Sequence, residues 1–182
     1  ITIISLQPGS ADELYDYWEK LGLICGRPDE AHQMVSSFKS EISRLKNKVD
    51  LIENRVYVYF ESIHSRMRTF SPKSISMFCL ETAGGHNIAS DAVPRSNTNI
   101  AGYSKERILQ HADAIDVFLA QQGRMNPVTI DMIKNEPGFG AIKAVRNNRV
   151  FLVDEILVSR PTPKLIEGMH LIHQLLYPEN EP

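Results

Sequence analysis

Residues 55–60 read RVYVYF, a run of β-branched and aromatic side chains that is typical of a buried strand. Two similar runs follow, AIDVFLA at 114–120 and RVFLVDE at 149–155. The stretch from residue 86 through Gly102 is predicted to be rich in turns. Helix-like segments lie at residues 71–85, 104–110, near 127–134, near 139–145 and from about 163 to 176. This alternation predicts an α/β fold: a three-layer αβα sandwich with a mainly parallel sheet.

A long amphipathic helix is predicted before the first of these strands, at residues 28–52. Pro28 suits the first turn of a helix. The apolar side chains then recur at intervals of three or four: Ala31, Met34, Val35, Phe38, Ile42, Leu45, Val49 and Ile52. The opposite face is charged and is expected to face solvent. Further upstream, ITIISL at residues 1–6 predicts a short strand without a partner, and a helix follows it.

The composition is that of a soluble globular domain, with 42% hydrophobic and 23% charged residues among 182. Lys and Arg total 20 against 22 Asp and Glu, and no basic stripe or block of like charge is present. This charge pattern argues against nucleic-acid binding. No apolar run approaches the roughly 20 residues of a membrane-spanning helix, so no such segment is expected.

The only two cysteines, Cys25 and Cys79, lie in the apolar contexts LGLICG and SMFCLE. Without a CxxC spacing, both are expected to be buried and unreactive. A disulfide between them is the alternative if the protein is exported.

Three polar loops are predicted at the carboxyl edge of the sheet, where open parallel sheets bind ligands. They run from Glu61 to Ser71, from Gln121 to Asn126 and from Glu155 to Arg160. The predicted ligand-binding side chains in them are His64, Arg66, Arg68, Gln122, Arg124 and Arg160.

Arg66 and Arg68 carry the most specific prediction at this edge. Two residues apart in an extended segment, they can face the same side and clamp a carboxylate or phosphate. The alternative is that both are solvated loop arginines. Arg160, which is expected at the same edge, favours the binding role.

The sequence predicts neither catalytic residues nor a metal site. It lacks GxGxxG, the P-loop pattern, GxSxG and HExxH, and no nucleophile and base pair is suggested by local spacing. His170 and His173 could share a metal by their spacing, but no third ligand stands nearby in sequence. A partly buried histidine pair is therefore expected instead.

Three stretches, taken in order, resemble a known family. LETAGGHNIA at 80–89 resembles a helix end followed by a Gly-Gly-x-Asn-Ile turn, and YSKERILQHADAIDVFLA at 103–120 resembles a Ser-x-Glu helix that leads into an apolar strand. The segment at 138–179 resembles the last strand, an Arg-Pro turn and the closing helix. Together they are similar to the C-terminal lobe of the solute-binding proteins of ABC importers whose two lobes are joined by one long helix.

That resemblance implies a division of the chain and a function. Residues 1–27 would be the last strand and helix of an N-terminal lobe, 28–53 the helix between the lobes, and 54–182 the C-terminal lobe. The protein would be extracytoplasmic and would bind a ferric siderophore, haem or cobalamin, with no catalytic activity and no cofactor of its own. Glu106, in the Ser-x-Glu segment, would dock onto the membrane permease.

Two other classes of function remain as alternatives at this point. One is an α/β enzyme or redox-protein domain with a nucleotide or metal-cluster site, which the missing glycine motifs and the few cysteines disfavour. The other is a regulatory or scaffold domain that binds only protein.

Overall fold

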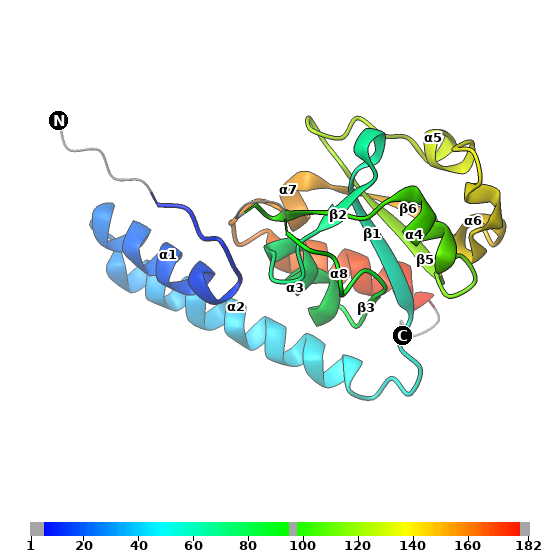
Figure 1. The fold of residues 1–182 in the computed structure, drawn as a ribbon. Coiled ribbons are helices and arrows are strands. Elements are labelled where there is room, and N and C mark those ends of the chain that lie inside the picture. The colour runs from blue at the N-terminus through cyan, green and yellow to red at the C-terminus, as the bar shows by residue number, and fades with distance from the viewer. Residues whose placement is uncertain (1–5, 95–97, 179–182) are drawn as a thin grey trace.

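The computed structural model describes residues 6–94 and 98–178. The chain begins with a helical hairpin, α1 (Asp12–Ile24) and α2 (Pro28–Val49), which stands beside an α/β lobe (Figure 1). The two helices meet closely because Gly22 has no side chain: a Cβ there would collide with the Ala31 methyl group. The strand predicted at residues 1–6 falls mostly outside the described residues.

The long helix has the predicted amphipathic character. Its buried side chains recur at three- and four-residue intervals and are Val35, Phe38, Ile42, Leu45 and Val49. It ends at Val49, before the predicted end at residue 52, because the chain turns there and the Ile52 N–H donates to Val49 O at 3.0 Å. The hairpin is fastened to the lobe by Trp18, whose indole Nε1 donates to Pro161 O at 2.9 Å.

The sheet is mainly parallel, as predicted. Its central strands β1 (Tyr57–Ile63), β5 (Val117–Gln122) and β6 (Val150–Asp154) run parallel as neighbours. The antiparallel strands β2 (Arg68–Phe70) and β4 (Ile100–Gly102) extend one edge, and β3 (His86–Asn87) pairs with the start of β1. These three strands were expected to be loops, because two or three residues are too few to show a strand pattern.

Helices cover both faces of the sheet (Figure 1), which confirms the predicted layered α/β fold. On the first face lie α2, α3 (Ile75–Thr82) and α8 (Leu165–Leu176). The second face carries α4 (Lys105–Gln110), α5 (Ile130–Lys134), η2 (Phe139–Ala141) and α6 (Lys143–Arg146). Two short segments, η1 (His64–Arg66) and α7 (Glu155–Val158), follow β1 and β6.

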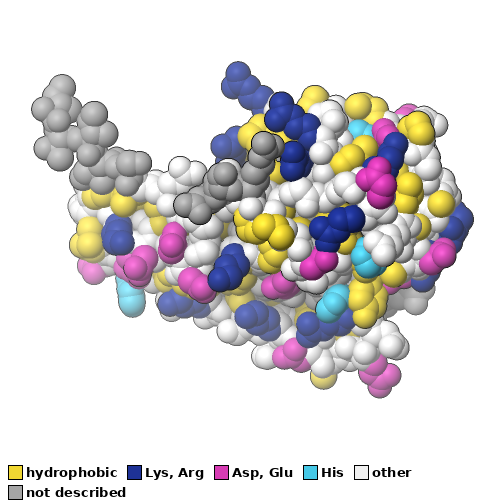
Figure 2. All heavy atoms as spheres, in the orientation of Figure 1, with side chains coloured by type: hydrophobic (Ala, Val, Ile, Leu, Met, Phe, Trp, Pro, Cys, Tyr) yellow, Lys and Arg dark blue, Asp and Glu magenta, His cyan; other side chains and the backbone are white. Residues whose placement is uncertain are grey.

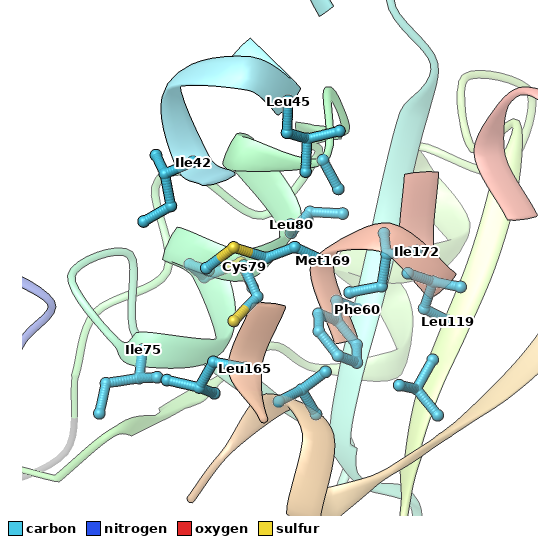
Figure 3. Close-up of a cluster of buried hydrophobic side chains, with 14 of the residues drawn as sticks. Ile42, Leu45, Phe60, Ile75, Cys79, Leu80, Leu119, Leu165, Met169 and Ile172 are labelled. Atoms are coloured by element: carbon cyan, nitrogen blue, oxygen red, sulfur yellow. The ribbon is translucent and has the colours of Figure 1, made fainter. Parts of the chain in front are cut away.

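Alternation along the strands divides the core in two. Phe60 and Leu119 point to the first face, where side chains from α2, α3 and α8 converge on them (Figure 3). Tyr59 and Phe118 point to the second face, with ring centroids 5.1 Å apart. The sheet is thus apolar on both sides, as strands of a buried parallel sheet must be.

Helix α3 ends as its glycines suggest. Gly84 adopts a φ of +94°, a conformation that a side chain would disfavour, and the Gly85 N–H closes the helix by donating to Leu80 O at 3.0 Å. Next to this turn, His173 Nδ1 lies 3.0 Å from Ala83 O. His173 therefore has a structural partner in the turn.

The prediction that both cysteines are buried is half wrong. Cys79 is buried in α3, and burial raises the pKa of its thiol because the thiolate would be desolvated. Cys25 is exposed at the end of α1, where Leu23 and Ile24 also face solvent. The apolar neighbours of Cys25 in the sequence did not show which side of the last turn of α1 is buried. The two cysteines are not paired with each other.

None of the helices in the described parts of the chain is both long enough and apolar enough to span a membrane.

Candidate functional site

The carboxyl ends of β1, β5 and β6 meet at one edge of the sheet, as predicted. Glu61 pairs with Ala120, and Gln122 pairs with Asp154. The bounds of all three predicted loops were wrong: β1 continues through Ile63, β5 continues through Gln122, and the segment after Asp154 forms α7 instead of an open loop.

A cavity of about 250 Å³ opens at this edge, on the face of the sheet that carries α3. Its floor is a chain of small polar groups. The Ser159 hydroxyl donates to Gln121 Oε1, and Ser159 Oγ lies 3.0 Å from Ser76 Oγ. The lining residues are Gln7, Ser62, Phe70, Ile75, Ser76, Asn99, Ile100, Gln121, Met125, Glu155, Ser159 and Arg160. The cavity can therefore contact a ligand through both hydroxyl or amide groups and apolar side chains.

Among the described residues that line the cavity, two are charged, and they pair with each other. Arg160 Nη2 donates to Glu155 Oε1 at 2.7 Å. The Glu155 carboxylate packs against Gly123, where a Cβ would collide with it. Because Glu155 is buried and Arg160 half exposed, the pair holds the guanidinium at the mouth of the cavity.

A second, larger hollow of about 990 Å³ adjoins the cavity and shares Asn99 with it. It lies between the start of α1 and the turn that leads into α3. Its charged lining residues are Asp12, Glu13, Lys73 and Glu81. Residues 9–13 thus face the lobe across this space, and Gln7 lines the smaller cavity, so the segment before α1 forms one wall of the candidate site.

Of the predicted ligand-binding residues, only Arg160 lines the cavity. Arg66 and Arg124 are exposed, and Gln122 is exposed with its amide Nε2 donating to Val128 O at 2.9 Å. Arg68 is half buried, with its guanidinium against Gly102. Figure 2 shows several Lys and Arg side chains at the upper edge of the lobe. The ligand-binding role of Arg66, Arg68, Gln122, Arg124 and Arg160 stays a prediction.

The reason given for an arginine clamp was wrong. Arg66 belongs to the 3₁₀ turn η1, and Met67 has a φ of +47°, so the segment from Arg66 to Arg68 is not extended. The two side chains are therefore not aligned by strand alternation. Any shared contact with a ligand depends on the turn that separates them.

His64, also predicted to bind ligand, is buried and fully engaged. Its Nδ1 lies 2.9 Å from Oε2 of Glu61, which is completely buried. Its backbone N–H donates to Asn126 Oδ1 at 2.9 Å, and the Asn126 amide donates in turn to Gln121 O at 2.7 Å. This cluster joins the ends of β1 and β5, and the sequence showed no sign of the Glu61 partner.

Sequence reasoning missed the hydroxyl groups of the cavity. Ser62 could have been found, because it continues the alternation of Val58 and Phe60 and is the first polar residue on that face of β1. Ser76 and Ser159 could not, because they come from α3 and the end of α7, and only the packing of these helices brings them together.

Glu106 lies in the first turn of α4 and is exposed. A hydrogen bond from Ser104 holds the pKa of its carboxyl below the usual value, so the side chain is charged at neutral pH. An exposed negative charge at this position suits a contact with a basic partner, and it also complements the positive end of the helix.

Comparison with known proteins shows which family this chain belongs to. The model of a family described as periplasmic binding protein matches residues 1–157, and the chain belongs to that family. A relative from Bacillus subtilis (strain 168), described as an uncharacterized ABC transporter substrate-binding lipoprotein, YvrC, is 27% identical over 184 residues. That match covers 98% of this chain and 55% of the relative. The chain therefore spans about half the length of this curated relative.

Solved protein structures also match this chain. A possible iron-binding (periplasmic solute-binding) protein from Staphylococcus epidermidis ATCC 12228 matches with a TM-score of 0.79 and 26% identity, over 97% of this chain and 67% of the other. A periplasmic heme-binding protein from Roseiflexus sp. RS-1 matches with a TM-score of 0.78 and 19% identity, over 94% and 64%, which shows a shared fold. The predicted family resemblance, the α/β fold and the extracytoplasmic location are thereby confirmed.

Proposed function

We propose that this chain is part of the substrate-binding component of an ABC importer, which captures a metal complex and delivers it to the permease. In this proposal residues 1–27 end an N-terminal lobe, residues 28–53 form the helix between the lobes, and residues 54–182 form the C-terminal lobe. The ligand lies in a cleft between the lobes, and the protein catalyses no reaction.

The observation that carries the proposal is the cavity lined by Gln121, Ser159 and Arg160. It lies beyond the carboxyl ends of parallel strands, where open α/β sheets bind ligands. Gln7, in the segment before α1, lines the same cavity, as a wall belonging to a second lobe would. Membership of a family of binding proteins favours ligand capture over catalysis at this edge.

The proposed ligand is an iron complex such as a ferric siderophore, or haem or cobalamin. Proteins of similar structure are described as iron-binding and heme-binding, which supports this class. The test is a titration of the whole protein with ferric hydroxamates, ferric catecholates, haem and cobalamin, followed by the absorbance of each ligand. Saturable binding of one of these at micromolar concentration is expected, and failure of all of them would overturn the proposed class.

We expect Arg66→Ala combined with Arg68→Ala to weaken binding of an anionic complex by the whole protein. Each charge-assisted hydrogen bond that is lost costs about 1.5–3 kcal/mol, so the dissociation constant should rise at least tenfold. Titration by ligand absorbance measures the change. Arg44→Ala, which removes an exposed charge from α2, is the control and should have no effect. Unchanged affinity in the double variant would show that these arginines do not contact the ligand.

For Glu106→Ala we expect normal ligand affinity together with impaired transport, because the exposed carboxylate is assigned to permease docking and lies outside the cavity lining. Uptake of radiolabelled ligand by cells, compared with binding by the purified protein, separates the two effects. Glu167→Ala removes an exposed carboxylate from the first turn of α8 and serves as the control. The docking assignment is wrong if binding is lost and transport falls only in proportion.

A further inference from the structure

The buried pair of Glu61 and His64 is one end of a longer chain of charged side chains. On the far side of the imidazole ring, His64 Nε2 lies 3.7 Å from Glu136 Oε2, in the turn between α5 and η2. The other oxygen of Glu136 forms an ion pair with Lys105 Nζ, in the first turn of α4. Four side chains therefore run from the end of β1 to the residue next to Glu106.

We propose that His64 is a positioning residue, which connects the cavity edge to the first turn of α4 through Glu61, Glu136 and Lys105. At the cavity end, Ser62 and Met125 line the cavity, and His64 and Asn126 lie close to them in sequence and hydrogen-bond to each other. The far end is Lys105, beside Glu106.

The burial of Glu61 explains why this series of charged side chains needs His64. Glu61 is fully buried, and its Oε1 finds no hydrogen-bond partner among the described residues. Such a carboxylate is stable only with a compensating positive charge or a proton. The other charged groups facing His64 are Glu136 and Lys105, which offset each other. With one proton shared between Glu61 and His64, these four side chains therefore carry no net charge.

The pair consequently holds its proton more tightly than separate groups would. Burial raises the pKa of Glu61, and the hydrogen bond to Glu61 raises the pKa of His64 above its ordinary value of 6.5. The two groups titrate as a unit. The stabilisation is fully present below about pH 6.5 and is lost as pH rises through the pKa of the folded pair. Local opening should therefore increase by up to about tenfold per pH unit within that window.

Three backbone amides report on the two ends of the connection. The Met67 N–H donates to His64 O at 3.0 Å, and the Tyr103 N–H donates to Met67 O at 3.3 Å, so both report on the turn η1. The Ile108 N–H donates to Ser104 O at 3.0 Å and reports on the first turn of α4. Hydrogen exchange at these amides in the whole protein, followed between pH 6 and 9 and corrected for intrinsic exchange, tests the proposal.

In the unaltered protein, protection at all three amides should fall together as pH rises above about 6.5. His64→Asn, which keeps a donor beside Glu61 but does not titrate, should abolish this fall at every amide. Glu136→Gln, which keeps the size of this partly exposed side chain and removes its charge, should abolish it at Ile108 and preserve it at Met67 and Tyr103.

The matched control is His32→Asn, since His32 also pairs with a glutamate, Glu19, at 3.3 Å, but on the exposed helical hairpin. It should leave the pH dependence unchanged. Protection at Ile108 that is independent of pH in the unaltered protein, or that still falls in Glu136→Gln, would overturn the connection. Only the link to docking through Glu106 rests on the proposed function. The exchange experiment tests the internal connection whichever ligand or partner the protein has.

Discussion

Gly168→Ala is expected to destabilise the protein by about 3 kcal/mol, the upper range for overpacking. Gly168 lies at the end of the first turn of α8, where it packs against the backbone of α7. A Cβ at this position would overlap Leu157 O and stand 2.8 Å from the Leu157 carbonyl carbon. Since main-chain atoms cannot rotate away, α8 must move, and the roughly 1 kcal/mol by which alanine favours a helix over glycine does not compensate.

Urea unfolding measures this loss as a lower midpoint with an unchanged slope. Gly140→Ala is the matched control, because a Cβ at Gly140 would meet nothing within 4 Å. Its effect should stay within about 0.5 kcal/mol. Equal stability of Gly168→Ala and the unaltered protein would mean that α7 and α8 do not approach as closely as described. Because α7 carries Glu155, a shift of α8 should also disturb the cavity.

On the proposed function, the largest effect on binding is expected from separating this chain from the proposed N-terminal lobe. If the whole protein binds its ligand at about 1 μM, near −8 kcal/mol, and the two walls of the cleft contribute equally, this chain retains about −4 kcal/mol. That corresponds to a dissociation constant of about 1 mM, a loss of roughly a thousandfold. Calorimetry of both proteins with the same ligand measures the ratio.

The physical reason is that the described cavity is small. At about 250 Å³ it falls below the usual 300–1,000 Å³ of a small-molecule site, and the adjoining hollow of about 990 Å³ is open to solvent. Micromolar binding of a ferric siderophore, haem or cobalamin by this chain alone would show that the ligand is not shared between two lobes.

Much of the fold could be predicted because its signals are local. The strands β1, β5 and β6 are continuous apolar runs, and the spacing of Val35, Phe38, Ile42 and Leu45 marks the buried face of α2. The short strands β2, β3 and β4 escaped prediction because their pairing, and not their own side chains, makes them strands.

The candidate site was predicted as a location but less well as a set of residues. The carboxyl edge follows from the order of parallel strands, so its position could be predicted. Charged side chains were favoured as ligand contacts, whereas the cavity is lined mainly by Ser62, Ser76, Gln121 and Ser159 with apolar neighbours. Hydroxyl groups are common in any sequence, and their convergence depends on how α3 and α7 pack.

His64 illustrates the difference most clearly. Its sequence position, in a polar stretch after a strand, is equally compatible with a ligand contact and with a buried partner of Glu61. By itself the sequence determined the class of fold, the long amphipathic helix, the position of the carboxyl edge of the sheet and the family, because periodicity and motif order are properties of the chain. Only the tertiary structure decided which side chains are buried and which of them meet. Burial and pairing depend on segments distant in sequence, such as β1, the loop after β5 and the turn after α5.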